Sequence, residues 1–164
     1  MVIWIIGKSG SGKTFLAKKL CEVFSKIRKK IKWIDGDKFR ARNSRDLGFS
    51  ISDRKKNSKR IQNFCHKYER RNYLVLCSIL SIFKEHQKKN RTLFNDYLQI
   101  YIKVNSSILK KRNNKNIYKF KKNVVGKDIE FPNPYKSDLI IKNNFKKIFL
   151  KNIKKIEKLV NEKI

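Results

Sequence analysis

The sequence predicts an α/β fold in which a five-stranded, mostly parallel sheet lies between two layers of helices. Short, continuous apolar segments such as residues 2–6 recur along the 164 residues, and such segments are typical of strands buried on both faces. Segments with the apolar spacing of helices alternate with them. A glycine-rich loop directly follows the first strand. Because no Gly/Ser-rich linker or internal repeat interrupts this order, we expect a single domain over residues 1–164.

The alternation defines each element in turn. Strands are expected at residues 2–6, 31–34, 73–77, 98–104 and 138–141, and the apolar runs at 2–6 and 73–77 are continuous. Helices are expected at residues 13–30, 52–71, 85–96, 106–112 and about 145–163. Apolar residues recur at helical spacing in the first and last of these helices, whereas 52–71 is a polar helix. We expect Ser52 to cap the second helix.

Two segments fit no element. Residues 36–50 are polar and rich in Arg, and residues 113–136 contain both prolines. Loops of this length inside a compact domain are usually binding loops or lids. We therefore expect the first segment to belong to a binding site and residues 113–136 to form a lid.

The chain is strongly basic, with 43 Lys and Arg against 13 Asp and Glu and a formal net charge of +30. Such a balance suggests a nucleic-acid-binding protein. However, the 33 Lys outnumber the 10 Arg and accompany 21 Ile and 16 Asn. All three enriched residues have A/U-rich codons, so genome composition accounts for them without a function. We expect no specific nucleic-acid partner, only a positive field that attracts anionic ligands.

Cysteine spacing and hydropathy bear on where the protein works. The three cysteines lie far apart without metal-ligand spacing, which favours a reducing cytoplasmic environment. The apolar run at residues 1–6 is far shorter than the roughly 20 residues that span a membrane. No leader precedes it, so we expect a cytoplasmic protein without membrane association.

The glycine-rich loop carries the clearest functional signal. Residues 7–14, GKSGSGKT, satisfy the pattern G-x-x-x-x-G-K-[ST] and lie between a buried strand and a helix, where a P-loop must lie. Glycines let backbone N–H groups converge on phosphate oxygens, and the helix N-terminus adds positive potential. The predicted ATP-binding residues are Gly7, Lys8, Ser9, Gly10, Ser11, Gly12, Lys13 and Thr14. Within the motif, Lys13 reaches the β- and γ-phosphates and the Thr14 hydroxyl ligates Mg²⁺.

A second candidate site follows the second strand, at the sheet edge where ligands bind in such folds. Asp35 and Asp37 lie either side of Gly36. In phosphoryl transfer, one such carboxylate can orient the attacking hydroxyl while another holds water on Mg²⁺. The same Asp-Gly-Asp sequence also occurs in ordinary turns. Five of the ten Arg lie within residues 40–60, and this concentration favours an anionic acceptor substrate.

Together, these motifs resemble the adenylyl-sulfate kinase family. The resemblance rests on the P-loop, on DGDKFR at 35–40, on DLGFS at 46–50 and on DRKKN at 53–57, and it extends more loosely to about residue 142. It implies a P-loop NTPase fold and a homodimer. It also implies an enzyme that uses ATP and Mg²⁺ to phosphorylate the ribose 3′-hydroxyl of adenosine 5′-phosphosulfate, a small nucleotide acceptor.

The resemblance assigns roles to matching positions. Asp35 and Asp37 would flank the acceptor ribose, with Asp37 contacting the 3′-hydroxyl. Phe49, which the pattern alone would equally well place in the core, would stack on the acceptor base. Arg40 and Arg54 would bind the acceptor's anionic group, and Asn57 would contact its polar edge. Ser81 matches a serine that is sometimes phosphorylated in the family, and we place it among the catalytic and substrate-binding residues. Arg112 would lie near the ATP base, and Lys119 would belong to the lid.

Three departures from the family pattern affect the acceptor pocket. Ile82-Phe83-Lys84 follows Ser81 where the family has Pro-Tyr-Arg. The lid is about five residues shorter than in the family pattern when short connecting segments are taken as the norm. Residues 123–126 read Asn-Val-Val-Gly instead of Asn-Phe-Thr-Gly, so the second aromatic wall of the base pocket is missing. Two acceptors therefore stay open: adenosine 5′-phosphosulfate, or cytidine 5′-diphosphoramidate in capsule phosphoramidate biosynthesis. A basic P-loop nucleic-acid-binding protein is the alternative of another class.

Overall fold

The structure, a computed structural model, describes residues 1–27, 30–112, 123–145 and 149–163. It contains a five-stranded sheet whose strands run in the order β2-β3-β1-β4-β5. Every neighbouring pair is parallel, so the sheet is wholly parallel. The strands are β1 (Val2–Ile6), β2 (Ile31–Asp35), β3 (Leu74–Ile79), β4 (Tyr97–Lys103) and β5 (Leu139–Lys142). The predicted three-layer α/β fold is confirmed.

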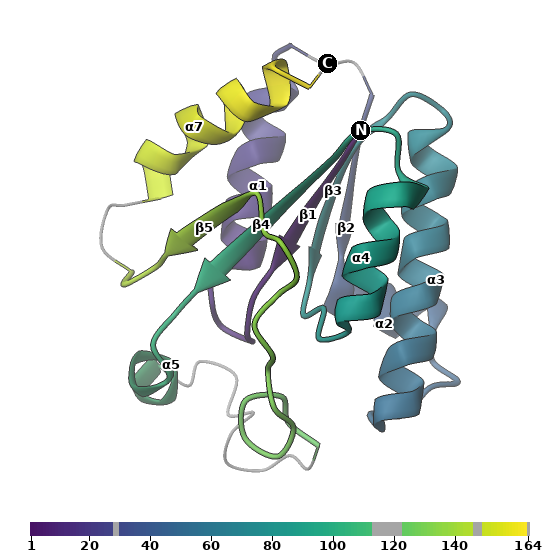
Figure 1. Ribbon diagram of the computed structural model, residues 1–164, viewed down its shortest axis with the longest axis vertical. Coiled ribbons are helices and arrows are strands. Elements are labelled where there is room, and N and C mark those ends of the chain that lie inside the picture. Colours follow the sequence, from purple (N-terminus) through teal and green to yellow (C-terminus); the bar gives the residue numbers. More distant parts are fainter. Residues whose placement is uncertain (28–29, 113–122, 146–148, 164) are drawn as a thin grey trace.

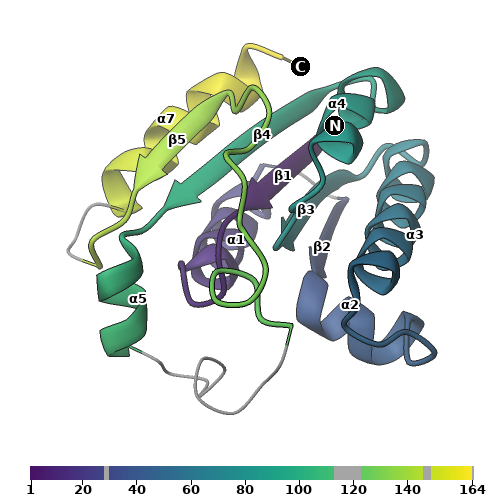
Figure 2. The same ribbon diagram turned by 60° about the horizontal axis from the view of Figure 1, so that its bottom comes forward.

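Helices cover both faces of this sheet (Figure 1). One face is covered by α1 and α7, and the other by α3 and α4. The short helices α2 and α5 lie beyond the ends of the strands (Figure 2). The bounds are α1 (Lys13–Phe24), α2 (Gly36–Asn43), α3 (Ile51–Glu69), α4 (Lys84–Leu93), α5 (Ser106–Arg112) and α7 (Phe149–Asn161).

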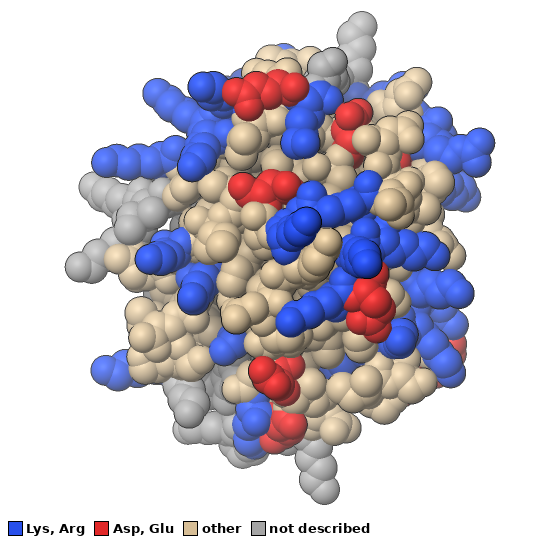
Figure 3. All heavy atoms as spheres, viewed as in Figure 1, with Lys and Arg blue, Asp and Glu red and all other residues tan. Residues whose placement is uncertain are grey.

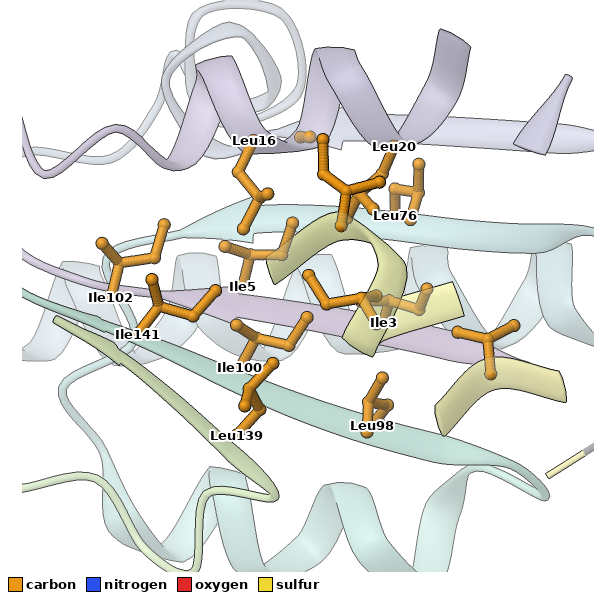
Figure 4. Packing of buried hydrophobic residues seen from close by; sticks show 14 of the residues in the cluster. Ile3, Ile5, Leu16, Leu20, Leu76, Leu98, Ile100, Ile102, Leu139 and Ile141 are labelled. Atoms are coloured by element: carbon orange, nitrogen blue, oxygen red, sulfur yellow. The ribbon is translucent and has the colours of Figure 1, made fainter. Parts of the chain in front are cut away.

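The apolar runs are continuous because each central strand contributes side chains to two hydrophobic clusters, one on each face of the sheet. In β1, Ile3 and Ile5 pack with the α1 and α7 cluster, whereas Val2, Trp4 and Ile6 pack with the α3 cluster. All five side chains are completely buried. Figure 4 shows Ile3 and Ile5 among the leucines and isoleucines of the first cluster. Alternate side chains of a strand point to opposite faces, so a strand covered on both faces shows no polar alternation.

Residues 36–43 form α2, where the sequence predicts only a loop. Asp35 caps this helix, since its side chain accepts hydrogen bonds from the backbone N–H groups of Asp37 and Lys38. Phe39 is the buried residue that holds the helix against the α3 side of the sheet. A single buried position in eight residues leaves no apolar period to detect, which explains the missed helix.

Several predicted helix ends are also wrong. Helix α1 ends at Phe24 instead of residue 30, and α4 covers residues 84–93 instead of 85–96. The described part of the last helix begins at Phe149 instead of residue 145. Phe145 has a φ of 62°, in the left-handed region, and such a residue interrupts a right-handed helix.

The cap of α3 is Ser50, not the predicted Ser52. The Ser50 side chain accepts a hydrogen bond from the backbone N–H of Asp53 and donates to its carboxylate at 2.7 Å. This reciprocal contact satisfies a helix-end donor, and α3 accordingly begins at Ile51. The helix ends at Glu69, near the predicted residue 71.

A buried amide positions the loop after β3. Gln87 of α4 is completely buried; it donates to the carbonyl of Ser81 and accepts from the N–H of Tyr135. It thereby ties the Ser81 loop to the segment that leads into β5. In the described part of the chain, no helix is both long enough and apolar enough to cross a membrane.

We expect Ser50→Ala to lower the free energy of unfolding by about 1 kcal/mol, because it removes the cap of α3. Ser52→Ala makes the same side-chain change two residues later, and we expect no comparable loss. Urea unfolding of both variants measures the difference. Equal destabilisation by the two substitutions would contradict the assignment of Ser50 as the cap.

Candidate active site

The P-loop connects β1 to α1 at the carboxyl edge of the sheet (Figure 2). Gly7 must lack a side chain, because a Cβ there would lie 2.5 Å from Ser11 Oγ and 2.9 Å from the carbonyl oxygen of Ile102. Gly10 and Gly12 have φ values of 76° and 98°, which strongly favour glycine. A compact loop of this kind at a helix N-terminus is suited to binding phosphate. The structure therefore places residues 7–14 together, as predicted.

Side chains from three elements hold the loop. Lys13 Nζ donates to the Lys8 carbonyl at 2.9 Å, and Lys8 Nζ donates to Ser106 Oγ of α5, also at 2.9 Å. Asn143, after β5, donates from Nδ2 to the Ser11 carbonyl at 2.9 Å and is 3% exposed. No sequence motif marks Asn143 as part of the site. The available signal is its position as a polar residue directly after a parallel strand, which brings it to the same edge as the P-loop.

A hydrogen bond joins the P-loop to the acidic pair. Thr14 Oγ1 donates to Asp35 Oδ2 at 2.9 Å, and Ser78 Oγ donates to the same oxygen at 3.3 Å. The other oxygen, Oδ1, accepts from the N–H groups of Asp37 and Lys38 at 3.1 and 3.3 Å. Hydroxyl and carboxylate oxygens are ligands that suit Mg²⁺. The donor set beside Thr14 therefore fits this ion.

Phe49 lies on the surface between two cations. The guanidinium carbons of Arg40 and Arg54 are 4.6 and 5.6 Å from its ring centroid, within the range of cation–π contact. The side chain is 52% exposed, so Phe49 is not a core phenylalanine. Part of its surface therefore remains open to solvent beside the two guanidinium groups.

Backbone carbonyls fix both guanidinium groups. Arg40 donates from Nη2 to the carbonyl of Gly48. Arg54 donates from Nε to the Phe49 carbonyl at 3.1 Å and from Nη2 to the Asn123 carbonyl at 2.8 Å. Arg54 therefore connects the first turns of α3 to the segment that begins at residue 123.

The two guanidinium groups are held in an environment that disfavours positive charge. Burial lowers the pKa of Arg40, and the nearby carboxylates of Asp53 and Asp37 partly oppose that shift. Burial also lowers the pKa of Arg54, the positive charge of Arg40 lowers it further, and Asp37 opposes both effects. An anionic ligand between these cations would offset their repulsion.

The other arginines of residues 40–60 include two with structural contacts. Arg60 binds both carboxylate oxygens of Asp46, at 2.6 and 2.7 Å, and the pKa of Arg60 rises because of this hydrogen-bonded pair. Arg45 donates from Nε to the Ala41 carbonyl at 2.8 Å. Part of the concentration of Arg in the sequence therefore supports the α2–α3 connection, and Arg40 and Arg54 remain candidates for binding an anion.

Two further predicted residues carry buried atoms that lack partners. Asn57 and Ser81 are 7% and 5% exposed. Within the described residues, Asn57 Oδ1 and Ser81 Oγ have no hydrogen-bond partner. A buried polar atom without a partner is costly, and a bound ligand is one of the ways in which that cost can be offset.

Two of the remaining assigned residues, Asp37 and Arg112, belong to the short helices α2 and α5. Asp37 is exposed in the first turn of α2, next to Asp35. Arg112 is the last residue of α5, and its side chain is outside the described part. Lys119 and the rest of residues 113–122 also lie outside the described residues.

The segment that replaces the aromatic wall is a compact turn. Val124 and Val125 are 5% and 3% exposed. The Val124 carbonyl accepts from the N–H groups of residues 127, 128 and 129, which closes the small loop seen in Figure 2. Both valines are therefore used in packing.

We expect Asn143→Asp to weaken ATP binding by about tenfold or more, because a carboxylate would face the Ser11 carbonyl in place of a hydrogen-bond donor. Asn95→Asp introduces the same charge in the exposed turn before β4, at the opposite edge of the sheet, and we expect it to leave ATP affinity within twofold. Calorimetry measures both affinities. Equal affinity in the two variants would show that Asn143 does not support the loop.

Known proteins share both the sequence pattern and the fold. The family model described as adenylylsulphate kinase matches residues 1–142. A probable adenylyl-sulfate kinase of Bacillus subtilis (strain 168) is 30% identical over 150 residues, covering 87% of this chain and 75% of the relative. An adenylyl-sulfate kinase of Prochlorococcus marinus is 37% identical over 120 residues, covering 72% and 60%.

Among solved structures, the APS kinase of Mycobacterium tuberculosis in complex with AMPPNP and APS superposes with a TM-score of 0.87 at 23% identity, covering 98% of this chain and 96% of that chain. At this identity the superposition shows the fold alone. The family match spans the P-loop, the acidic pair and the Arg40–Phe49–Arg54 group. This protein therefore belongs to the adenylylsulphate kinase family of P-loop kinases.

Proposed function

We propose that this kinase transfers the γ-phosphoryl group of ATP to the ribose 3′-hydroxyl of adenosine 5′-phosphosulfate, with Mg²⁺. The observation that carries the proposal is the hydrogen bond from Thr14 to Asp35. It brings the phosphate loop and the acidic pair together at one sheet edge. The anion-binding surface comes after the acidic pair in the sequence and consists of Arg40, Phe49 and Arg54.

The chain's own groups account for nucleotide binding. The backbone of residues 7–14 would bind the phosphates, and Lys13 would neutralise the γ-phosphate. Thr14 would hold Mg²⁺ directly, with Asp35 oriented toward the same position. When bound, Mg²⁺ supplies positive charge that stabilises the phosphate oxygens during transfer.

We assign different roles to Asp35 and Asp37. Both oxygens of Asp35 accept hydrogen bonds from the protein. The family resemblance assigns the acceptor hydroxyl to Asp37, and Asp35, which is bonded to Thr14, is then directed toward the metal position. The 3′-oxygen attacks the γ-phosphorus, the bond from that phosphorus to the bridging oxygen of ADP breaks, and the hydroxyl proton passes to Asp37.

The acceptor's other groups match the remaining side chains. Arg40 and Arg54 would bind its phosphosulfate, and Phe49 would stack on its base. Asn57 and Ser81 carry buried atoms that have no partner among the described residues and that a bound nucleotide would satisfy. Arg112 is assigned to the ATP base.

Four proposals concern the domain organisation, the lid, the assembly and the location of the protein. Residues 1–164 form a single domain in which residues 113–136, with Lys119, act as a lid over the phosphates. The enzyme is a homodimer, as the family resemblance implies, and works in the cytoplasm. The hexameric APS kinase of Thiobacillus denitrificans, with a TM-score of 0.72 at 18% identity over 98% of this chain and 28% of that chain, shows that this fold also occurs in larger assemblies.

A second acceptor, cytidine 5′-diphosphoramidate, is favoured by the valine turn. Because Val124 and Val125 are small and buried, they offer no aromatic face opposite Phe49. Base–aromatic stacking is worth roughly 1–3 kcal/mol per base in single-stranded nucleic-acid complexes. With only one aromatic wall, the pocket gains less stacking energy from a purine, so its preference for a purine over a smaller pyrimidine is weaker.

We expect purified wild-type protein with Mg-ATP to phosphorylate adenosine 5′-phosphosulfate, and Lys13→Ala to reduce the rate at least about 100-fold because it removes the γ-phosphate contact. Lys18→Ala removes an exposed lysine one turn later on α1 and should stay within twofold. The 3′-phosphorylated product, measured by chromatography, is the readout. A wild-type protein that phosphorylates neither nucleotide would contradict the proposed function.

We expect Val124→Phe to raise kcat/KM for adenosine 5′-phosphosulfate relative to cytidine 5′-diphosphoramidate, because it restores an aromatic wall. Overpacking at this buried site should also cost about 1–3 kcal/mol of stability. Val125→Phe controls for that cost, since the neighbouring position is equally buried. Competition between the two acceptors under limiting ATP measures the ratio. An unchanged ratio in folded Val124→Phe would show that the base is bound elsewhere.

A further inference from the structure

We propose that Trp33 and Ser78 are positioning residues that orient Asp35 and, through it, Thr14 for Mg-ATP. They form a hydrogen-bond relay with one direction, from the indole of Trp33 to Ser78 and from Ser78 to Asp35, which also accepts from Thr14. This inference rests on the proposed binding of Mg-ATP at the P-loop, and it adds two residues that make no contact with phosphate themselves.

Strand register places the relay on one face of the sheet. Asp35 of β2 and Ser78 of β3 are direct partners in the parallel ladder, so their side chains lie next to each other. Trp33 precedes Asp35 by two residues and therefore points to the same face. This is the face covered by α1, because Trp33 packs against the cluster that contains Leu16. Thr14 lies in the first turn of α1.

The distances form a continuous path. Trp33 Nε1 donates to Ser78 Oγ at 3.1 Å, and Ser78 Oγ donates to Asp35 Oδ2 at 3.3 Å. Thr14 Oγ1 donates to the same Asp35 oxygen at 2.9 Å. Donors from β3 and α1 therefore meet at one carboxylate oxygen, and the donor from β2 reaches it through Ser78.

The chemistry of the groups fixes the direction of every proton. An indole N–H only donates, and an ionised carboxylate only accepts. The Ser78 oxygen must therefore accept from Trp33, which directs its own proton to Asp35. The Thr14 proton is directed to Asp35 in the same way. The lone pairs of Thr14 are then left for a cation, which is the orientation that binding Mg²⁺ requires.

Partial burial stiffens the first two links of the relay, from Trp33 to Ser78 and from Ser78 to Asp35, whereas the Thr14–Asp35 bond is exposed. Ser78 is 3% exposed and Asp35 is half-buried. The Trp33 ring is half-buried and has the Lys38 ammonium 5.7 Å from its centroid. Hydrogen bonds in such surroundings are stronger than in water and polarise one another. Without the indole donor, the Ser78 hydroxyl loses the contact that selects its rotamer.

The chain supplies a matched control in its other tryptophan. Trp4 is completely buried, and its Nε1 has no hydrogen-bond partner within the described residues. Trp4→Phe therefore removes an indole N–H without breaking a hydrogen bond recorded in the described residues. Trp33→Phe removes the N–H that begins the relay. Comparison of the two separates loss of the donor from loss of indole bulk.

The test is a Mg²⁺ titration at a fixed concentration of a non-hydrolysable ATP analogue, followed by calorimetry, with unfolding curves to confirm that each variant is folded. We expect Trp33→Phe to need about threefold to tenfold more Mg²⁺ for half-saturation, the loss typical of one hydrogen bond. Trp4→Phe should remain within twofold of the wild type. A Trp33→Phe variant with the wild-type Mg²⁺ requirement would overturn the proposal.

A double-mutant cycle tests the order of the relay. Because Trp33 acts through Ser78, Trp33→Phe should have no further effect on Mg²⁺ dependence once Ser78→Ala is present. If the two effects multiply, Trp33 acts through packing and the relay is wrong.

Failure of the proposed function gives a different result. If the wild type phosphorylates neither nucleotide but the cycle behaves as expected, the acceptor reaction is wrong and the relay stands. If Mg²⁺ does not affect analogue binding to the wild type, both are overturned.

Discussion

The hydrogen bond between Thr14 and Asp35 is the contact on which the site depends. In the sheet order β2-β3-β1, β3 separates the strand that precedes the P-loop from the strand that ends in Asp35. The first turn of α1 and the end of β2 therefore meet across β3, and Ser78 of β3 bonds to the same carboxylate. Asp35 thus connects three elements and also caps α2. One residue sets the position of the phosphate loop relative to the acceptor side.

The proposed acceptor side holds two like charges, those of Arg40 and Arg54, close together. Arg40 and Arg54 lie close enough for the charge of Arg40 to lower the pKa of Arg54, and both guanidinium groups contact Phe49. Backbone carbonyls at Gly48, Phe49 and Asn123 hold them in place. On the face shown in Figure 3, Lys and Arg lie over much of the surface with Asp and Glu between them. The proposed anion site therefore rests on this local pair more than on the net charge.

Much of the scaffold could be predicted because burial leaves a direct trace in sequence. Strands covered on both faces appear as unbroken apolar runs, and the P-loop pattern is specific. Helix α2 left no such trace, since Phe39 is its only buried residue among those of the helix. Phe49 looked equally suited to the core, and only the structure shows its exposed ring between two cations.

Contacts between distant residues could not be predicted in this way. The Ser50 cap depends on where α3 begins, and Ser50 and Ser52 look alike in sequence. Asn143 meets Ser11 across 132 positions, and Trp33 meets Ser78 only because strand register aligns β2 with β3. Such contacts depend on topology, which sequence periodicity does not contain.

The most direct test of the account is a crystal structure with Mg²⁺, a non-hydrolysable ATP analogue and adenosine 5′-phosphosulfate. We predict that the phosphates lie along residues 7–14, that Thr14 Oγ1 ligates Mg²⁺ while still contacting Asp35, and that the acceptor 3′-hydroxyl lies between Asp37 and the γ-phosphate. Phosphates bound away from this loop, or an acceptor ribose remote from both aspartates, would contradict it.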